Sequence, residues 1–165
     1  MRLVELFDKV VKWKWRSKPG FFRTWADFTT DSGDQYSVGV VDERINGVRD
    51  LYQNNEDAQF LLSDLDGKDK VINAEFALRG KGSSLGAEYD EAKHGITGTG
   101  NAYVVLSTVI NIIEDYIKNN PAKYLRIVAE EPSRRKLYAR MVRAMSKKTV
   151  YTFENEGNKV FLIEL

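Results

Sequence analysis

The chain has 165 residues, of which 42% are hydrophobic and 30% are charged, and its formal net charge is +1. This length is close to the commonest domain size and the composition is that of a globular protein, so neither a disordered nor a fibrous chain is expected. Cysteine is absent, which excludes disulfide frameworks, thiolate zinc sites, iron–sulfur clusters and cysteine nucleophiles.

The distribution of apolar and charged residues predicts a cytoplasmic protein without membrane association. Glu5 and Asp8 interrupt residues 1–10, so this segment lacks the continuous apolar core of a signal peptide. The longest apolar-rich stretch, residues 102–117, is broken by polar residues and is shorter than the roughly 20 residues of a membrane-spanning helix. Residues 121–165 hold ten Lys and Arg against five Asp and Glu, which hints at an anionic partner.

The first 43 residues predict a helix and a β-hairpin. Apolar residues at positions 3, 6, 7, 10 and 11 have helical spacing, so we expect a short amphipathic helix that ends at or before Pro19-Gly20. Residues 22–30 and 35–42 are rich in aromatic and β-branched residues and are separated by a short loop that contains Gly33. This arrangement is typical of a hairpin.

Cations and aromatic residues are interleaved before and inside this hairpin, as Lys12-Trp13-Lys14-Trp15-Arg16 and Phe21-Phe22-Arg23-Thr24-Trp25. Proteins that bind single-stranded nucleic acid use such mixtures to stack bases and to neutralise phosphates. The tryptophans can equally fill the core while the cationic side chains reach out to water. We favour the second interpretation.

Acidic residues outnumber basic ones from Glu43 to Asp69, and Asn46-Gly47 and Asp66-Gly67 supply turn chemistry. We expect residues 44–69 to form a loop-rich insertion, with a small helical cap as the alternative. Residues 71–78 then alternate with a period of two, which predicts a strand with one buried face.

The last part of the chain predicts helices and strands in alternation. We expect a helix of about five turns after Gly100, a strand at 124–129, a helix from Pro132 to about Met145, and a terminal hairpin of residues 150–153 and 159–165. The predicted fold is therefore one α+β (α/β) domain, residues 1–165, with a core at 70–165. Its central sheet is expected to be mixed, mostly antiparallel and flanked by helices.

Two features of this part could carry chemistry, of which the first is the glycine run Thr97, Gly98, Thr99, Gly100 and Asn101 at the start of a predicted helix. Free N–H groups at such a turn favour an anion such as a cofactor pyrophosphate. Alternatively, Thr99 or Asn101 simply caps the helix. His94, the only histidine, is either a base beside this run or a solvated loop residue, and we expect no metal site.

The second feature is the helix that begins at Pro132. Its spacing places Tyr138 on an apolar side and places four cations on the opposite side: Lys136, Arg140, Arg143 and Lys147. This basic face is either a solvated helix surface or a contact for nucleic acid, a phosphorylated ligand or an acidic protein.

Residues 71–165 resemble the GCN5-related N-acetyltransferases (GNAT), acyl-CoA N-acyltransferases in which a strand and a glycine-bearing loop lead into a helix that holds the acetyl-CoA pyrophosphate. Leu137-Tyr138 matches the Leu-Tyr of that family, so the resemblance implies that Tyr138 is a general acid toward the departing thiolate. Gly95 stands where the family has Gln or Arg, and Glu131 stands where it has Asn.

Three segments are similar to a group of uncharacterised tailed-bacteriophage proteins: Gly95–Asn101, Thr108–Ile113 and Glu131–Tyr138. This resemblance implies a phage protein that acts in an infected bacterial host cell, and it implies no activity.

The leading hypothesis is an N-acyltransferase that uses acetyl-CoA, with the pyrophosphate at residues 97–101. In this hypothesis Tyr138 protonates the thiolate, and an acid or His94 takes the proton of the amine. The rival is a non-catalytic phage accessory protein that binds a host factor, a defence component or a virion partner. A third hypothesis is nucleic-acid binding through the helix at 132–146.

Overall fold

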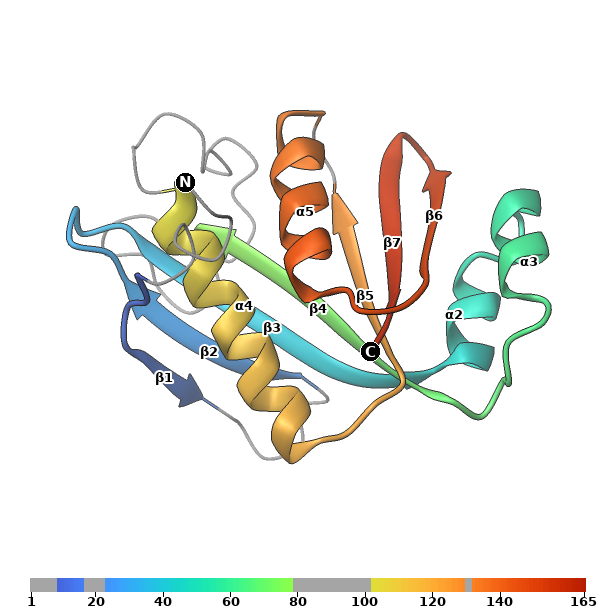
Figure 1. Ribbon diagram of the computed structural model, residues 1–165, viewed down its shortest axis with the longest axis horizontal. Helices are drawn as coiled ribbons and strands as arrows, with labels where there is room; N and C mark the ends of the chain where they lie inside the picture. The colour runs from blue at the N-terminus through green and yellow to red at the C-terminus, as the bar shows by residue number, and fades with distance from the viewer. Residues whose placement is uncertain (1–8, 17–22, 79–101, 130–131) are drawn as a thin grey trace. The chain divides into compact units, whose positions relative to one another are not determined.

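The computed structural model describes residues 9–16, 23–78, 102–129 and 132–165 (Figure 1). The helices in these ranges are α2 (Ile45–Leu51), α3 (Glu56–Leu62), α4 (Ala102–Asn119) and α5 (Pro132–Met145). The strands are β1 (Trp13–Arg16), β2 (Thr24–Thr29), β3 (Gln35–Arg44), β4 (Lys70–Leu78), β5 (Tyr124–Ala129), β6 (Val150–Asn155) and β7 (Asn158–Glu164). None of the helices in the described ranges combines the length and the apolar character needed to cross a membrane.

The seven strands form one sheet in the order β1-β2-β3-β4-β5-β7-β6. β4 and β5 are parallel, whereas β1–β2, β2–β3, β5–β7 and β6–β7 are antiparallel. β4 and β5 can pair in parallel because the connection between them contains α4, and adjacent parallel strands need a crossover of this kind. These findings confirm the α+β class and the mixed, mostly antiparallel sheet.

The contacts within the chain divide it into two compact units. The first unit comprises Met1–Val40 and Glu75–Tyr116, and the second comprises Val41–Ala74 and Ile117–Leu165. The boundaries fall inside β3, β4 and α4, so each of these three elements contributes residues to both units.

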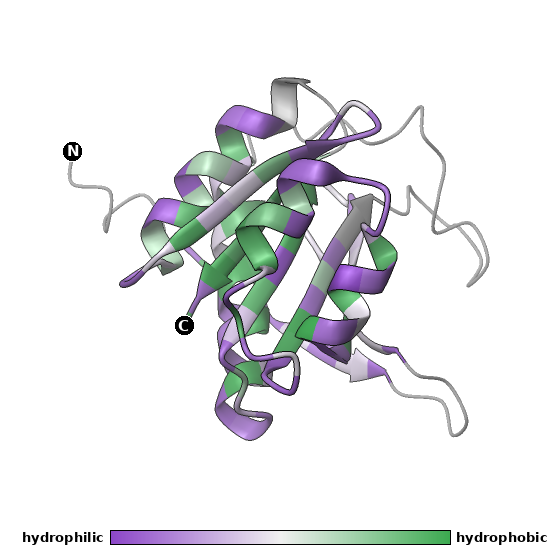
Figure 2. Ribbon diagram, turned by 90° about the vertical axis from the view of Figure 1, so that its right-hand side faces the viewer, coloured by the Kyte–Doolittle hydropathy of each residue, from purple (hydrophilic) through white to green (hydrophobic). Residues whose placement is uncertain are grey.

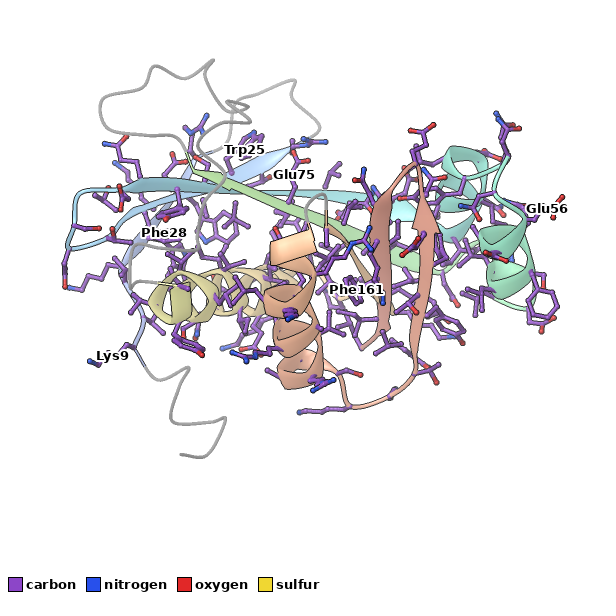
Figure 3. All side chains as sticks on the ribbon, turned by 90° about the horizontal axis from the view of Figure 1, so that it is seen from above. Lys9, Trp25, Phe28, Glu56, Glu75 and Phe161 are labelled. Atoms are coloured by element: carbon purple, nitrogen blue, oxygen red, sulfur yellow. The ribbon has the colours of Figure 1, made fainter. Side chains whose placement is uncertain are left out.

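In the first unit, strands β2 and β3 present a buried apolar face. Phe28 of β2 is paired in register with Tyr36 of β3, and their rings stack with centroids 5.2 Å apart. Figure 3 shows Phe28 on the side of the strands where α4 lies, and Trp25 on the opposite side. α4 supplies the other half of this core through residues at helical spacing: Val105, Leu106, Val109, Ile112 and Ile113.

Residues 13–16 form β1, where the N-terminal helix was expected to continue, so this part of the prediction is wrong. Trp13 and Trp15 alternate with Lys14 and Arg16, and this period of two fits a strand. Residues 1–8, which hold the rest of the predicted helix, lie outside the described residues. The expected strands at 22–30, 35–42 and 71–78 correspond to β2, β3 and β4, although residue 22 is not described.

In the second unit, helices pack on both faces of the strands, and Figure 1 shows α5 beside β5. Side chains of β7 alternate between the two faces. Val160 and Leu162 belong to a core cluster with residues of α2 and α3, whereas Phe161 lines a groove together with residues of α5. The turn between β6 and β7 is tight because Glu156 and Gly157 both have positive φ, 51° and 82°.

Most of the acidic segment, expected to be loop-rich or to form a small helical cap, lies in two short helices, α2 and α3. Asn55 caps α3, since its Oδ1 accepts a hydrogen bond of 2.9 Å from the N–H of Ala58. At the other end of α3, the guanidinium of Arg49 donates to the carbonyl oxygens of Leu62 and Leu65. These bonds satisfy groups that a helix leaves without partners at its ends.

Candidate functional site

The residues predicted to bind the cofactor, Thr97, Gly98, Thr99, Gly100 and Asn101, lie outside the described residues, and so does His94. What the structure describes is the element that follows them: α4 begins at Ala102 and runs for 18 residues. A helix of this length has a positive end at its first turn, which favours an anion there.

Tyr138 lies on the buried side of α5 and is 3% exposed. Met141, Val142 and Met145 are buried with it, as the helical spacing predicted. The phenol is thus part of the packed interior of the second unit. Its role as a proton donor remains a prediction.

The four positions predicted for the basic face are exposed; Lys136, Arg140 and Arg143 lie on α5, and Lys147 lies two residues after the helix ends at Met145. Arg140 has an interaction partner, so its charge is not free. The neighbouring Arg135 is half-buried and donates to Glu154 Oε1 at 3.0 Å and to the carbonyl oxygen of Gly157. The helices of the molecule carry hydrophilic and hydrophobic residues in separate bands (Figure 2).

The tryptophans of the N-terminal stretch divide between the two faces of the sheet in the first unit. Trp15 donates from Nε1 to Asp115 of α4 at 3.0 Å and packs against the ring of Tyr116. Trp25 and Glu75 lie on the other face (Figure 3). The interpretation as core residues therefore fits Trp15 and does not fit Trp25.

The indole ring of Trp25 packs against Gly39, and two arginine side chains lie near the same ring. A Cβ at position 39 would come within 2.8 Å of the indole ring, so the close packing depends on glycine. Arg16 and Arg23 each place their guanidinium carbon 5.8 Å from the ring centroid. Arg16 is paired with Asp27 at 2.8 Å and Arg23 is paired with Glu75, so carboxylates compensate both charges.

A polar cluster that the sequence analysis did not single out lies on the sheet of the second unit. Arg126 of β5 donates from Nε to Asn73 Oδ1 of β4 at 2.6 Å and from Nη1 to the hydroxyl of Tyr52 at 2.5 Å. Tyr52 directly follows α2, and its ring centroid is 5.6 Å from the guanidinium carbon. The signal in the sequence was a lone charged residue in the otherwise uncharged strand Tyr124–Ala129.

Comparison with known proteins gives one partial match. Residues 86–161 match the model of DUF6934, a family of unknown function, and the chain is similar to that family over this stretch. The matched stretch includes 95–101, 108–113 and 131–138, the segments on which the bacteriophage resemblance rests. No curated protein and no solved structure matches the chain.

Proposed function

We propose that the protein is a divergent CoA-dependent N-acyltransferase of GNAT-like fold that holds the cofactor pyrophosphate at residues 97–101. The observation that carries this proposal is the order β4, α4, β5, α5 around the parallel pair β4–β5. This order agrees with the strand–helix–strand–helix unit of the acetyltransferase resemblance. The glycine run directly precedes α4 in the sequence, and helix N-termini bind phosphate through free N–H groups.

In the proposed reaction, the nitrogen of an amine attacks the thioester carbonyl, a C–N bond forms and the C–S bond breaks. Tyr138 gives its proton to the departing thiolate, and His94 or an acid takes the proton of the amine. The resemblance supports this role, because Leu137-Tyr138 matches the Leu-Tyr of the acetyltransferase family. The resemblance to bacteriophage proteins supports a site of action in an infected bacterial cell.

Titration with CoA and acetyl-CoA in a thermal-shift assay tests the proposal. A ligand that binds the native state alone raises stability by about 2.7 kcal/mol at a 100-fold excess over its Kd, so Tm should rise with concentration. Asn101→Asp places a negative charge directly before α4 and should weaken the response. Asn120→Asp, directly after α4, is the matched control and should leave it unchanged.

Two results would contradict the proposal: no shift at millimolar CoA and acetyl-CoA, or an equal loss of response in both variants. A folded protein that ignores both ligands would favour the non-catalytic accessory role instead. If CoA binds, Tyr138→Phe should slow release of the free thiol from acetyl-CoA while the thermal response to CoA persists.

The exposed basic face of α5 favours a second candidate function, the binding of nucleic acid. Charge reversal of Arg140 and Arg143 should weaken binding of a labelled oligonucleotide, measured by fluorescence anisotropy. Binding should also weaken as salt rises, because phosphate contacts release counterions. Affinity that is indifferent to salt or to this charge reversal would exclude the basic face as a nucleic-acid contact.

A further inference from the structure

Arg126 is a half-buried cation without a counter-ion in the second unit. Among the described residues, no carboxylate forms an ion pair with it. Two arginines of comparable burial, Arg16 and Arg135, are paired with Asp27 and Glu154, whereas Arg49 donates to backbone carbonyl oxygens. Arg126 instead meets two neutral groups, Asn73 and Tyr52.

The hydrogen-bonding capacity left in this cluster consists mainly of donors, with one lone pair left on each of the two acceptor oxygens. A guanidinium has five N–H donors and no acceptor, and the two contacts described use two of them. The hydroxyl of Tyr52 accepts from Arg126, and within the described part of the chain its own proton has no acceptor. The carbonyl oxygen of the Asn73 side chain accepts a hydrogen bond from Arg126. The NH₂ group of this side chain has no acceptor among the described residues.

The surroundings of the cluster are mostly apolar, and two carboxylates, Glu164 and Asp69, lie near Tyr124. Leu162 is the neighbour of Arg126 across the β5–β7 register, and the ring of Phe153 meets Tyr52 edge-on at 4.9 Å. Tyr124, on the same face of β5, is 2% exposed, and burial raises the pKa of its phenol, so it stays neutral. Attraction between opposite charges is stronger in such a setting than in water.

We propose that Arg126, Tyr52 and Asn73 form a binding site for a carboxylate or phosphate group. The planar guanidinium matches two oxygens of either anion, and the hydroxyl of Tyr52 and the amide of Asn73 supply further donors. Asn73 of β4 and Tyr52, which follows α2, already hold the arginine in place, so little side-chain entropy is lost on binding. The site lies in the second unit and does not depend on CoA binding at residues 97–101.

Titration of the full chain with inorganic phosphate and with acetate, each at constant ionic strength, tests this site. Saturable binding by calorimetry, together with a rise in Tm, is expected for at least one of the two anions. Phosphate alone, acetate alone or both then identifies the group that the site takes. The affinity should fall at least tenfold in Arg126→Met, because a hydrogen bond to a charged group contributes about 1.5–3 kcal/mol.

Tyr52→Phe keeps the ring, its contact with Phe153 and its position beside Arg126, and it removes the hydroxyl alone. This variant should fold and should bind the anion about fivefold to tenfold more weakly, which corresponds to one hydrogen bond. Arg49→Met is the matched control. It removes an arginine of the same unit whose partners are the carbonyl oxygens of Leu62, Ser63 and Leu65 and the Oδ1 atom of Asn46, so it should lower Tm without changing anion affinity.

Absence of saturable binding of both anions at tens of millimolar would overturn the proposal. An affinity that is unchanged in Arg126→Met and in Tyr52→Phe would also overturn it and would show an adventitious ion only. If Arg126→Met does not fold, Tyr52→Phe decides the outcome by itself.

Discussion

The side chain of Tyr36 has a ring that stabilises the native protein and a hydroxyl that destabilises it. Its side chain is 1% exposed and its ring stacks on Phe28, which is favourable. Its hydroxyl is buried without a hydrogen-bond partner among the described residues. A buried polar group in this condition costs about 1–3 kcal/mol of stability.

Replacement of Tyr36 by Phe should therefore stabilise the protein, by about 1 kcal/mol, because the ring remains and the unpaired hydroxyl is lost. Urea denaturation at neutral pH measures the change as a shift of the midpoint at constant slope. Tyr52→Phe is the control, since that hydroxyl accepts from Arg126 and its loss should destabilise. A destabilised Tyr36→Phe variant would mean that the hydroxyl has a partner in the native state.

The same residue links stability to alkaline pH. Burial, with a smaller contribution from Asp34, raises the pKa of Tyr36 above its usual value of 10.0. As pH rises through 10.0, the unfolded chain loses this proton before the native state does, so the native state loses stability. The advantage of Tyr36→Phe over the natural chain should grow above that pH.

Individual side chains mark the limit of prediction from sequence. The alternation in β1 determines that Trp15 and Arg16 face opposite sides, but a sequence does not state which side meets α4. That depends on the register that pairs Arg16 with Trp25 and Trp25 with Gly39. For the same reason Arg126 could be recognised as unusual in its strand, but its approach to Tyr52 could not be predicted.

At the scale of elements, long helices were predictable and short helices were not. The start of α4 and the bounds of α5 agree with the sequence pattern, because several helical turns repeat the signal. The bounds of β5 also agree, since its six mostly apolar residues form a distinct run. α2 and α3 have seven residues each, too few for a clear apolar stripe. The two ends of α3 are held by Asn55 and Arg49, which also bond to residues outside the helix or come from outside it, so these bonds depend on tertiary structure.

The side chain of Asn55 makes two kinds of hydrogen bond that stabilise the position of α3. Two substitutions can distinguish the contribution of each. Its Oδ1 caps the helix, and its Nδ2 donates to the carbonyl oxygen of Glu154 in β6 at 2.7 Å. Asn55→Ala loses both bonds and should cost about 1–2 kcal/mol for the cap, and more for the second bond. Asn55→Asp keeps the cap acceptor and should fall between Ala and Asn in a denaturation series. Equal stability of the Ala and Asp variants would show that the cap contributes nothing.

At the scale of the whole molecule, the sequence predicted the pairing of strands that follow one another in the chain. It did not predict the pairing of strands that are separated by another strand. The hairpin β6–β7 follows from its turn, and the parallel pair β4–β5 follows from the crossover that contains α4. The pairing of β5 with β7, which skips β6, has no local signal, because it depends on non-local contacts. The candidate cofactor residues 97–101 could be named from sequence, and their environment could not.

We expect the two compact units to unfold together, since β3 and β4 run through both. The three tryptophans, at positions 13, 15 and 25, all belong to the first unit, so tryptophan fluorescence reports on that unit. Leu162→Ala creates a cavity in the second unit and should lower the free energy of unfolding by about 2–5 kcal/mol. The fluorescence transition in urea should then move to a lower urea concentration.

The matched substitution Leu106→Ala empties a buried position in the first unit. If unfolding is cooperative, both variants shift the fluorescence and circular dichroism transitions together. A fluorescence midpoint that stays in place in Leu162→Ala would show instead that the units unfold separately.

The packing of Trp25 on Gly39 links the evolutionary histories of two positions that are 14 residues apart in the sequence. A side chain at position 39 excludes the indole, and once a smaller residue occupies position 25 the glycine is no longer required. The two positions should therefore change together among relatives, with Gly at 39 wherever Trp stands at 25. A substitution at either position alone disturbs this packing. We therefore expect related sequences either to keep both residues or to have changed both.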